Sequence, residues 1–61
     1  MEALRNKTFY STIFGEAIHI NEKYDVISLK RNSVIANLAE SKKYRHLVNF
    51  LIGESYEQSN N

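Results

Sequence analysis

The sequence contains no cysteine and no proline, and it has only two glycines among its 61 residues. Without cysteine the chain forms no disulfide and offers no thiolate to a metal ion. The two histidines, His19 and His46, stand far apart with no ligand pattern around them, so we expect no metal site and no cofactor. Gly15 and Gly53 are isolated, which excludes a glycine-rich phosphate loop.

Long hydrophobic runs are missing as well. No apolar stretch approaches the roughly 20 residues that a membrane-spanning helix needs. The N-terminus lacks the charged-then-apolar order of a signal peptide, so we expect a cytoplasmic protein. Serine, histidine and acidic residues are not spaced for nucleophilic catalysis, and the carboxylates are scattered, so we expect no enzyme.

The length of 61 residues allows one domain. A monomer of this size buries only about 60% of the surface that its unfolded chain exposes, so its stability is marginal. The hydrophobic fraction of 43% is typical of a globular domain. Small domains usually add disulfides, a metal or a partner subunit, and the first two are excluded here. We therefore expect a homodimer.

Apolar residues at three- and four-residue spacing predict a first helix over residues 8–20. Residues 1–6 could extend this helix or form a short edge strand. The same spacing assigns Tyr10 and Phe14 to the core rather than to base stacking, and His19 to a structural position beside the apolar face. The predicted apolar face comprises Tyr10, Ile13, Phe14, Ala17 and Ile18.

Two strands are predicted over residues 25–30 and 34–38, because both are rich in β-branched and apolar residues. Their connection centres on Asn32, a residue type that tolerates positive φ in hairpin turns.

A second helix is predicted over residues 41–52, with Ser41 as its N-cap and Gly53 just beyond its end. Residues 54–61 form a polar tail that we expect to be disordered, which limits the domain to residues 1–53. The expected buried face of this helix comprises Tyr44, Leu47, Val48 and Leu51.

The basic residues gather in the middle of the chain, although the net charge is only +1. Five of the eight lie between positions 30 and 45, opposed there by Glu40 alone. This cluster is either a solvated surface or a set of phosphate contacts, in which Lys30 and Arg31 would act from the hairpin tip. The five residues are Lys30, Arg31, Lys42, Lys43 and Arg45.

Three segments together resemble the N-terminal DNA-binding domain of the Phd/YefM antitoxins of bacterial toxin–antitoxin operons. "MEALRNKTFYSTI" stands where that family has a short strand and a helix, and "YDVISLKRN" where it has a strand ending in a basic turn. "SVIANLAESKKYRHL" resembles the second hairpin strand and a helix carrying Tyr-x-x-Leu, here Tyr44 and Leu47. Lys7 and Tyr10 replace the serine and arginine that usually open the family's first helix.

The resemblance implies an α+β fold with the order short strand, helix, β-hairpin, helix, and a core shared in a homodimer. It implies an antitoxin-type transcriptional repressor that binds operator DNA, autoregulates its operon and neutralises a cognate toxin. The alternative is a protein-interaction module, an inhibitor of a toxin or host protein that binds no DNA. The candidate DNA-contacting residues are Arg5, Lys7, Lys30, Arg31 and Lys42.

Overall fold

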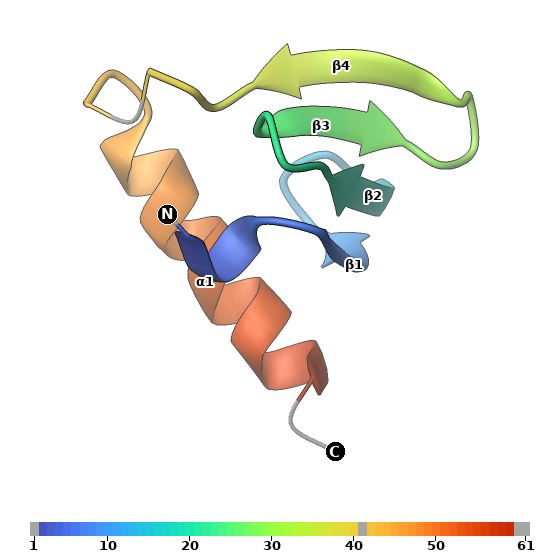
Figure 1. The fold of residues 1–61 in the computed structure, drawn as a ribbon. Coiled ribbons are helices and arrows are strands. Elements are labelled where there is room, and N and C mark those ends of the chain that lie inside the picture. Colours follow the sequence, from blue (N-terminus) through green and yellow to red (C-terminus); the bar gives the residue numbers. More distant parts are fainter. Residues whose placement is uncertain (1, 41, 60–61) are drawn as a thin grey trace.

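The computed structural model describes residues 2–40 and 42–59, which fold into an antiparallel sheet and one long helix (Figure 1). The predicted α+β class is therefore confirmed. None of the helical segments in the described part of the chain has the length and apolar character of a membrane span. The elements are a short 3-10 helix η1 (Glu2–Leu4), strands β1 (Lys7–Ser11), β2 (Glu16–Ile20), β3 (Asp25–Ser28) and β4 (Ser33–Asn37), and helix α1 (Arg45–Ser59).

The four strands lie in the order β1-β2-β3-β4, each antiparallel to the next. Because residues directly opposite in adjacent strands share a face, the register defines an inner and an outer side of the sheet. On the inner side Phe9 lies opposite Ile18, and Ile20 lies opposite Val26. Helix α1 packs along β1 and η1, so it covers the inner side next to one edge (Figure 1).

The core is small and comes from every part of the fold. Apolar side chains of the inner sheet side meet Leu4 from η1, Leu38 from the segment after β4, and two turns of α1. At about 25 cal/mol per Å² of apolar surface, each such side chain contributes roughly 1.5–3 kcal/mol. The buried apolar residues are Leu4, Phe9, Ile18, Ile20, Val26, Leu38, Val48 and Leu51.

The helix predicted over residues 8–20 is wrong, because this segment forms the β1–β2 hairpin. Its sequence also contains two alternating sets, Phe9 with Ser11 and Ile18 with Ile20, and these are the residues that the structure buries. Residues of the supposed helical face are scattered: Tyr10 and Ile13 are each 50% exposed. Gly15 adopts φ 69 in the turn between the strands, a conformation that glycine takes without penalty.

The hairpin predicted from residue 25 onward is confirmed, with strands at 25–28 and 33–37 in place of 25–30 and 34–38. Asn32 has the positive φ expected of it, 51°. The register shifts between Val26 and Ile27, which gives β4 one extra residue and a local bulge.

Helix α1 begins at Arg45, later than predicted, and runs through Gly53 to Ser59. The predicted end of the helix at residue 52 is therefore wrong, and residues 54–59, which we expected in a polar tail, belong to α1. The proposed N-cap, Ser41, lies outside the described residues. On the predicted apolar face Val48 and Leu51 are buried, whereas Tyr44 and Leu47 are half-buried.

Candidate nucleic-acid interface

Chain topology gathers most of the positive charge at one end of the sheet. The start of β1, the β2–β3 turn and the end of β4 meet there, because Lys7 lies opposite Ile20 and Asp25 lies opposite Asn37. The segment after β4 then leads into α1. Six of the eight basic residues belong to these segments, and we call them the cationic end: Arg5, Lys7, Lys23, Lys42, Lys43 and Arg45.

These six side chains are exposed. Within residues 2–40 and 42–59, the one ion pair at the cationic end joins Arg5 to Glu2 at 3.9 Å. That distance and the exposure of both side chains make the pair weak. Lys43 lies 5.5 Å from the centre of the Tyr44 ring, a cation–π contact that holds its ammonium group at the surface.

The β2–β3 turn, residues 21–24, presents Lys23 on a tightly bonded backbone. The Asn21 side-chain oxygen accepts hydrogen bonds from the backbone N–H groups of Lys23 and Asp25, both at 2.9 Å. Tyr24 adopts φ 64, where a bulky side chain costs about 1–2 kcal/mol. These hydrogen bonds, and the packing of Tyr24 against the core, offset that strain. The turn therefore fixes the backbone at Lys23, from which the side chain extends into solvent.

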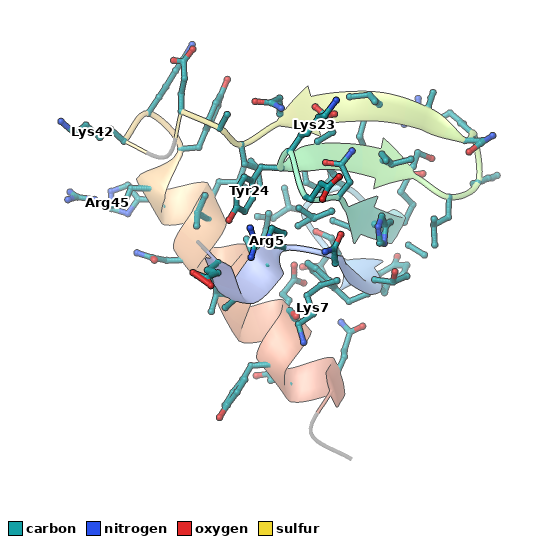
Figure 2. All side chains as sticks on the ribbon, in the orientation of Figure 1. Arg5, Lys7, Lys23, Tyr24, Lys42 and Arg45 are labelled. Atoms are coloured by element: carbon teal, nitrogen blue, oxygen red, sulfur yellow. The ribbon has the colours of Figure 1, made fainter. Side chains whose placement is uncertain are left out.

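A second left-handed residue lies beside this turn. Asn6 has φ 60, and it separates Arg5 from Lys7 at the point where the chain leaves η1 and enters β1. Figure 2 shows Arg5, Lys7 and Lys23 on the side facing the viewer, with Tyr24 between Arg5 and Lys23. Lys42 and Arg45 project from the start of α1 at the left of the same view.

The structure separates the five residues that the sequence nominated. Arg5, Lys7 and Lys42 belong to the cationic end, whereas Lys30 and Arg31 lie in the β3–β4 turn at the opposite end of the sheet (Figure 1). Arg31 is also paired: its guanidinium lies 2.9 Å from the Glu16 carboxylate. A DNA-contacting role for the hairpin tip stays a prediction, and Glu16 balances one of its two positive charges.

Glu16 is held ionised by its surroundings. The hydroxyl of Ser28 donates a hydrogen bond to its carboxylate and, with the Arg31 guanidinium, lowers the pKa of Glu16 below its usual value of 4.5. The pair therefore fastens β2 to the β3–β4 turn. Arg31 therefore has a structural partner that accounts for its position.

Sequence reasoning missed Lys23 as a candidate contact residue. The predicted helix over residues 8–20 leaves residues 21–23 outside any turn between strands, so Lys23 has no defined neighbours in that prediction. The signal that could have identified it is the asparagine at position 21, a residue type that commonly starts a tight turn between strands. The error in the preceding helix therefore concealed the site.

His19 has a local structural partner, as expected from the sequence. Its Nδ1 atom lies 2.7 Å from the Thr8 hydroxyl, across the β1–β2 pair on the outer side of the sheet. Among the residues that the structure describes, no group of three or more histidine, aspartate or glutamate side chains is placed to hold a metal ion.

Chemically, the cationic end can hold several phosphate groups through ammonium and guanidinium donors. Four carboxylates, those of Glu2, Glu22, Asp25 and Glu40, belong to the same segments. The Asp25 carboxylate accepts hydrogen bonds from the side-chain amides of Asn21 and Asn37, at 3.3 and 2.6 Å, which partly satisfies its charge. Compared with known proteins, the chain matches no protein-family model, no curated protein and no solved structure.

Proposed function

We propose that this chain is a DNA-binding regulator that acts as a homodimer and binds the phosphate backbone of DNA through its cationic end. One observation carries the proposal: six basic residues belong to segments that meet at one end of the sheet or follow directly from it, and a carboxylate lies within 4.0 Å of only one of them in the described part of the chain. Phosphates are the common biological ligand of such a surface, and each contact releases counterions from DNA. A cytoplasmic location accompanies this role.

The antitoxin-type part of the proposal rests on the sequence resemblance alone. It comprises repression of a toxin–antitoxin operon and neutralisation of a cognate toxin. The hairpin over residues 7–20 occupies the place of the helix that the family uses near DNA, so the fold lends this part no support. Base recognition is not assigned to any residue, because phosphate contacts position a protein without reading sequence.

The decisive experiment compares lysines from the two ends of the sheet. Lys7→Ala combined with Lys23→Ala removes two charges from the cationic end, and Lys30→Ala removes an exposed lysine from the opposite end. Affinity for a duplex DNA fragment is measured over a series of salt concentrations. The double variant should lower the slope of log affinity against log salt by about 0.9 for each phosphate that is no longer neutralised.

The Lys30→Ala control should leave both affinity and slope unchanged. An equal decrease in the control would place the phosphate contact at the hairpin tip instead. If the unmodified protein bound no DNA at low salt, the DNA-binding proposal would be wrong.

A protein-interaction module is the second candidate, and the outer side of the sheet favours it. Tyr10 and Val34 project from that side and are 50% and 58% exposed, and α1 does not cover them. The near-neutral net charge of +1 agrees with binding a protein rather than a polyanion. The salt series separates the two candidates, because a protein-interaction module should bind the DNA fragment at no salt concentration.

A further inference from the structure

The solvent-facing side of α1 contains a groove that nothing in the described chain fills. Its open volume is about 480 Å³, and its wall includes Thr12 from the β1–β2 turn. Phe50 stands beside it with 49% of its surface exposed, which is unusual for so large an apolar side chain. The lining residues are Thr12, Asn49, Phe50, Gly53, Glu54 and Glu57.

Gly53 forms a notch at the centre of this groove. It lies inside a 15-residue helix, where glycine costs about 1 kcal/mol relative to alanine. Among the described residues, a Cβ atom at this position would meet nothing within 4 Å, so no contact with them requires glycine. Phe50 lies three residues earlier, on the same helix face, and forms a projection beside the notch.

Charge along the helix is also divided. Lys42, Lys43 and Arg45 lie at or just before its start, and Glu54 and Glu57 lie in its second half. The helix dipole adds positive charge at the start and negative charge at the end. Two such helices attract each other when they run antiparallel, and they repel each other when they run parallel.

We propose that a second copy of this chain occupies the groove, with the two α1 helices packed antiparallel about Phe50 and Gly53. Each Phe50 ring then lies over Gly53 of the partner subunit, because an antiparallel pair centred between these positions places them opposite one another. Along the helix axis the same register brings Arg45, which lies on the flank of this face, within one turn of Glu57 of the partner subunit. Because the contact is two-fold symmetric, both pairings, Phe50 with Gly53 and Arg45 with Glu57, occur twice.

This inference rests on the homodimer of the proposed function and assigns the surface that forms it. Sedimentation of the full chain without DNA, over micromolar to submillimolar concentrations, tests it directly. Phe50→Ala should raise the dimer dissociation constant about tenfold or more, as truncating a central interface aromatic does. Val34→Ala, a matched truncation of a half-exposed apolar residue on the outer sheet side, should leave it unchanged.

A charge exchange tests the antiparallel orientation. Arg45→Glu and Glu57→Arg should each weaken the dimer several-fold, and the two changes together should restore it, because opposite charges again face each other. Both side chains are exposed, so these variants should fold even if Phe50→Ala does not.

Three results would overturn the inference: a monomer throughout the concentration range, a dimer broken by Val34→Ala but not by Phe50→Ala, or charge variants without any effect. DNA binding is measured separately. A dimer that Phe50→Ala leaves intact, in a chain that binds DNA, rejects this inference alone, and an unmodified dimer without DNA affinity rejects the DNA-binding proposal alone.

Discussion

The two glycines serve opposite purposes in the backbone. Gly15 adopts φ 69 in the β1–β2 turn, where its N–H donates a 2.7 Å hydrogen bond to the carbonyl of Ser11. Gly53 has ordinary helical geometry in the middle of α1. A methyl group at either position would meet no atom within 4 Å, so substitution changes backbone energetics and not packing.

Replacing the two glycines by alanine should therefore change the free energy of unfolding in opposite directions. Gly15→Ala should lower the free energy of unfolding by about 1–2 kcal/mol, because alanine resists the left-handed conformation. Gly53→Ala should raise it by up to about 1 kcal/mol, because alanine is the better helix former. Urea denaturation at a concentration low enough to keep the chain monomeric measures both values. Two changes of equal sign would contradict this assignment of the turn and the helix.

Leu51 is the residue of α1 on which the core depends most, since its side chain is fully buried against the sheet. Leu51→Ala should cost about 2–5 kcal/mol of unfolding free energy. A chain of this size has about 5 kcal/mol in total, so much of the population should unfold. Circular dichroism during urea titration provides the measurement, and Phe50→Ala is the control because Phe50 is 49% exposed. Equal decreases for the two variants would mean that the buried face of α1 is assigned wrongly.

At the scale of elements, three carboxylates each join parts of the fold that are distant in sequence. Glu16 joins β2 to the β3–β4 turn, and Asp25 receives hydrogen bonds from Asn21 and Asn37. Glu54 joins α1 to the β1–β2 turn: its Oε2 accepts hydrogen bonds from the backbone N–H and the hydroxyl of Thr12, at 2.9 and 2.8 Å. Partial burial raises the pKa of Glu54, but these hydrogen bonds outweigh it, so the net pKa is lowered.

Acid should therefore loosen the structure. The pKa of Asp25 is lowered from its usual 3.8 by the amides of Asn37 and Asn21, and the pKa values of Glu16 and Glu54 are lowered from 4.5. Because the folded values lie below the unfolded ones, the stabilisation is present above about pH 5 and disappears as the pH falls through the folded values. Thermal melting at a series of pH values from about 7 down to about 2 should show the decrease in stability below about pH 4.5.

Glu54→Gln provides the control for this pH dependence. It should be less stable than the parent at neutral pH and should lose less stability on acidification, because one of the three carboxylates is gone. An identical pH profile for the variant and the parent would show that Glu54 contributes nothing to acid sensitivity.

The sequence predicted the elements unevenly, for a physical reason. In residues 25–38 only the strand pattern fits, and the hairpin was found. In residues 8–20 both a helical and an alternating pattern fit, and the choice depends on which residues the rest of the fold covers. The end of α1 depends likewise on contacts beyond its own sequence, since Glu54 and Gln58 bond to the β1 strand and its turn.

The candidate site was predictable only in part, for a related reason. Exposed lysines carry no local signal of their function, and it is the strand register that brings Lys7 and Lys23 to one end of the sheet. A correct hairpin over residues 7–20 would have placed the 21–24 turn beside the start of β1. The composition alone revealed a basic segment, but not its division between two ends of the molecule.

Gln58 completes the free edge of β1 in the manner of an additional strand residue. The N–H of Tyr10 donates to its side-chain oxygen at 2.8 Å, and its amide nitrogen donates to the Tyr10 carbonyl at 2.7 Å. Gln58→Ala should cost about 0.5–1.5 kcal/mol for each hydrogen bond, with water compensating in part at this exposed position. Hydrogen exchange should accelerate at the Tyr10 amide, and the amide of Phe9 is the internal reference. Unchanged exchange at Tyr10 would contradict this pairing.

For the whole molecule, the distribution of charge matters more than its sum. The cationic end carries four carboxylates beside its six basic residues, a net charge of +2, whereas Glu16, Glu54 and Glu57 lie toward the other end with Lys30 and Arg31, a net charge of −1. Although the net charge is only +1, the charges are separated between the two ends, and the resulting dipole orients the molecule in an external field. A phosphate surface should meet this protein with one end first, and that orientation leaves the Phe50 face of α1 available.

The two edge strands of the sheet, β1 and β4, differ in how accessible their backbone groups are, and this difference limits polymerisation by strand addition. Fibres grow when each added strand offers a fresh row of unpaired backbone groups. Here Gln58 occupies both backbone groups of Tyr10 on the β1 edge, and Glu54 accepts the N–H of Thr12 just beyond it. A strand added at β1 would have to displace these side-chain hydrogen bonds, so β4 is the edge more open to strand addition. Two chains joined through β4 would expose β1 edges on both sides, where further growth is hindered, although the chain contains no proline to interrupt it.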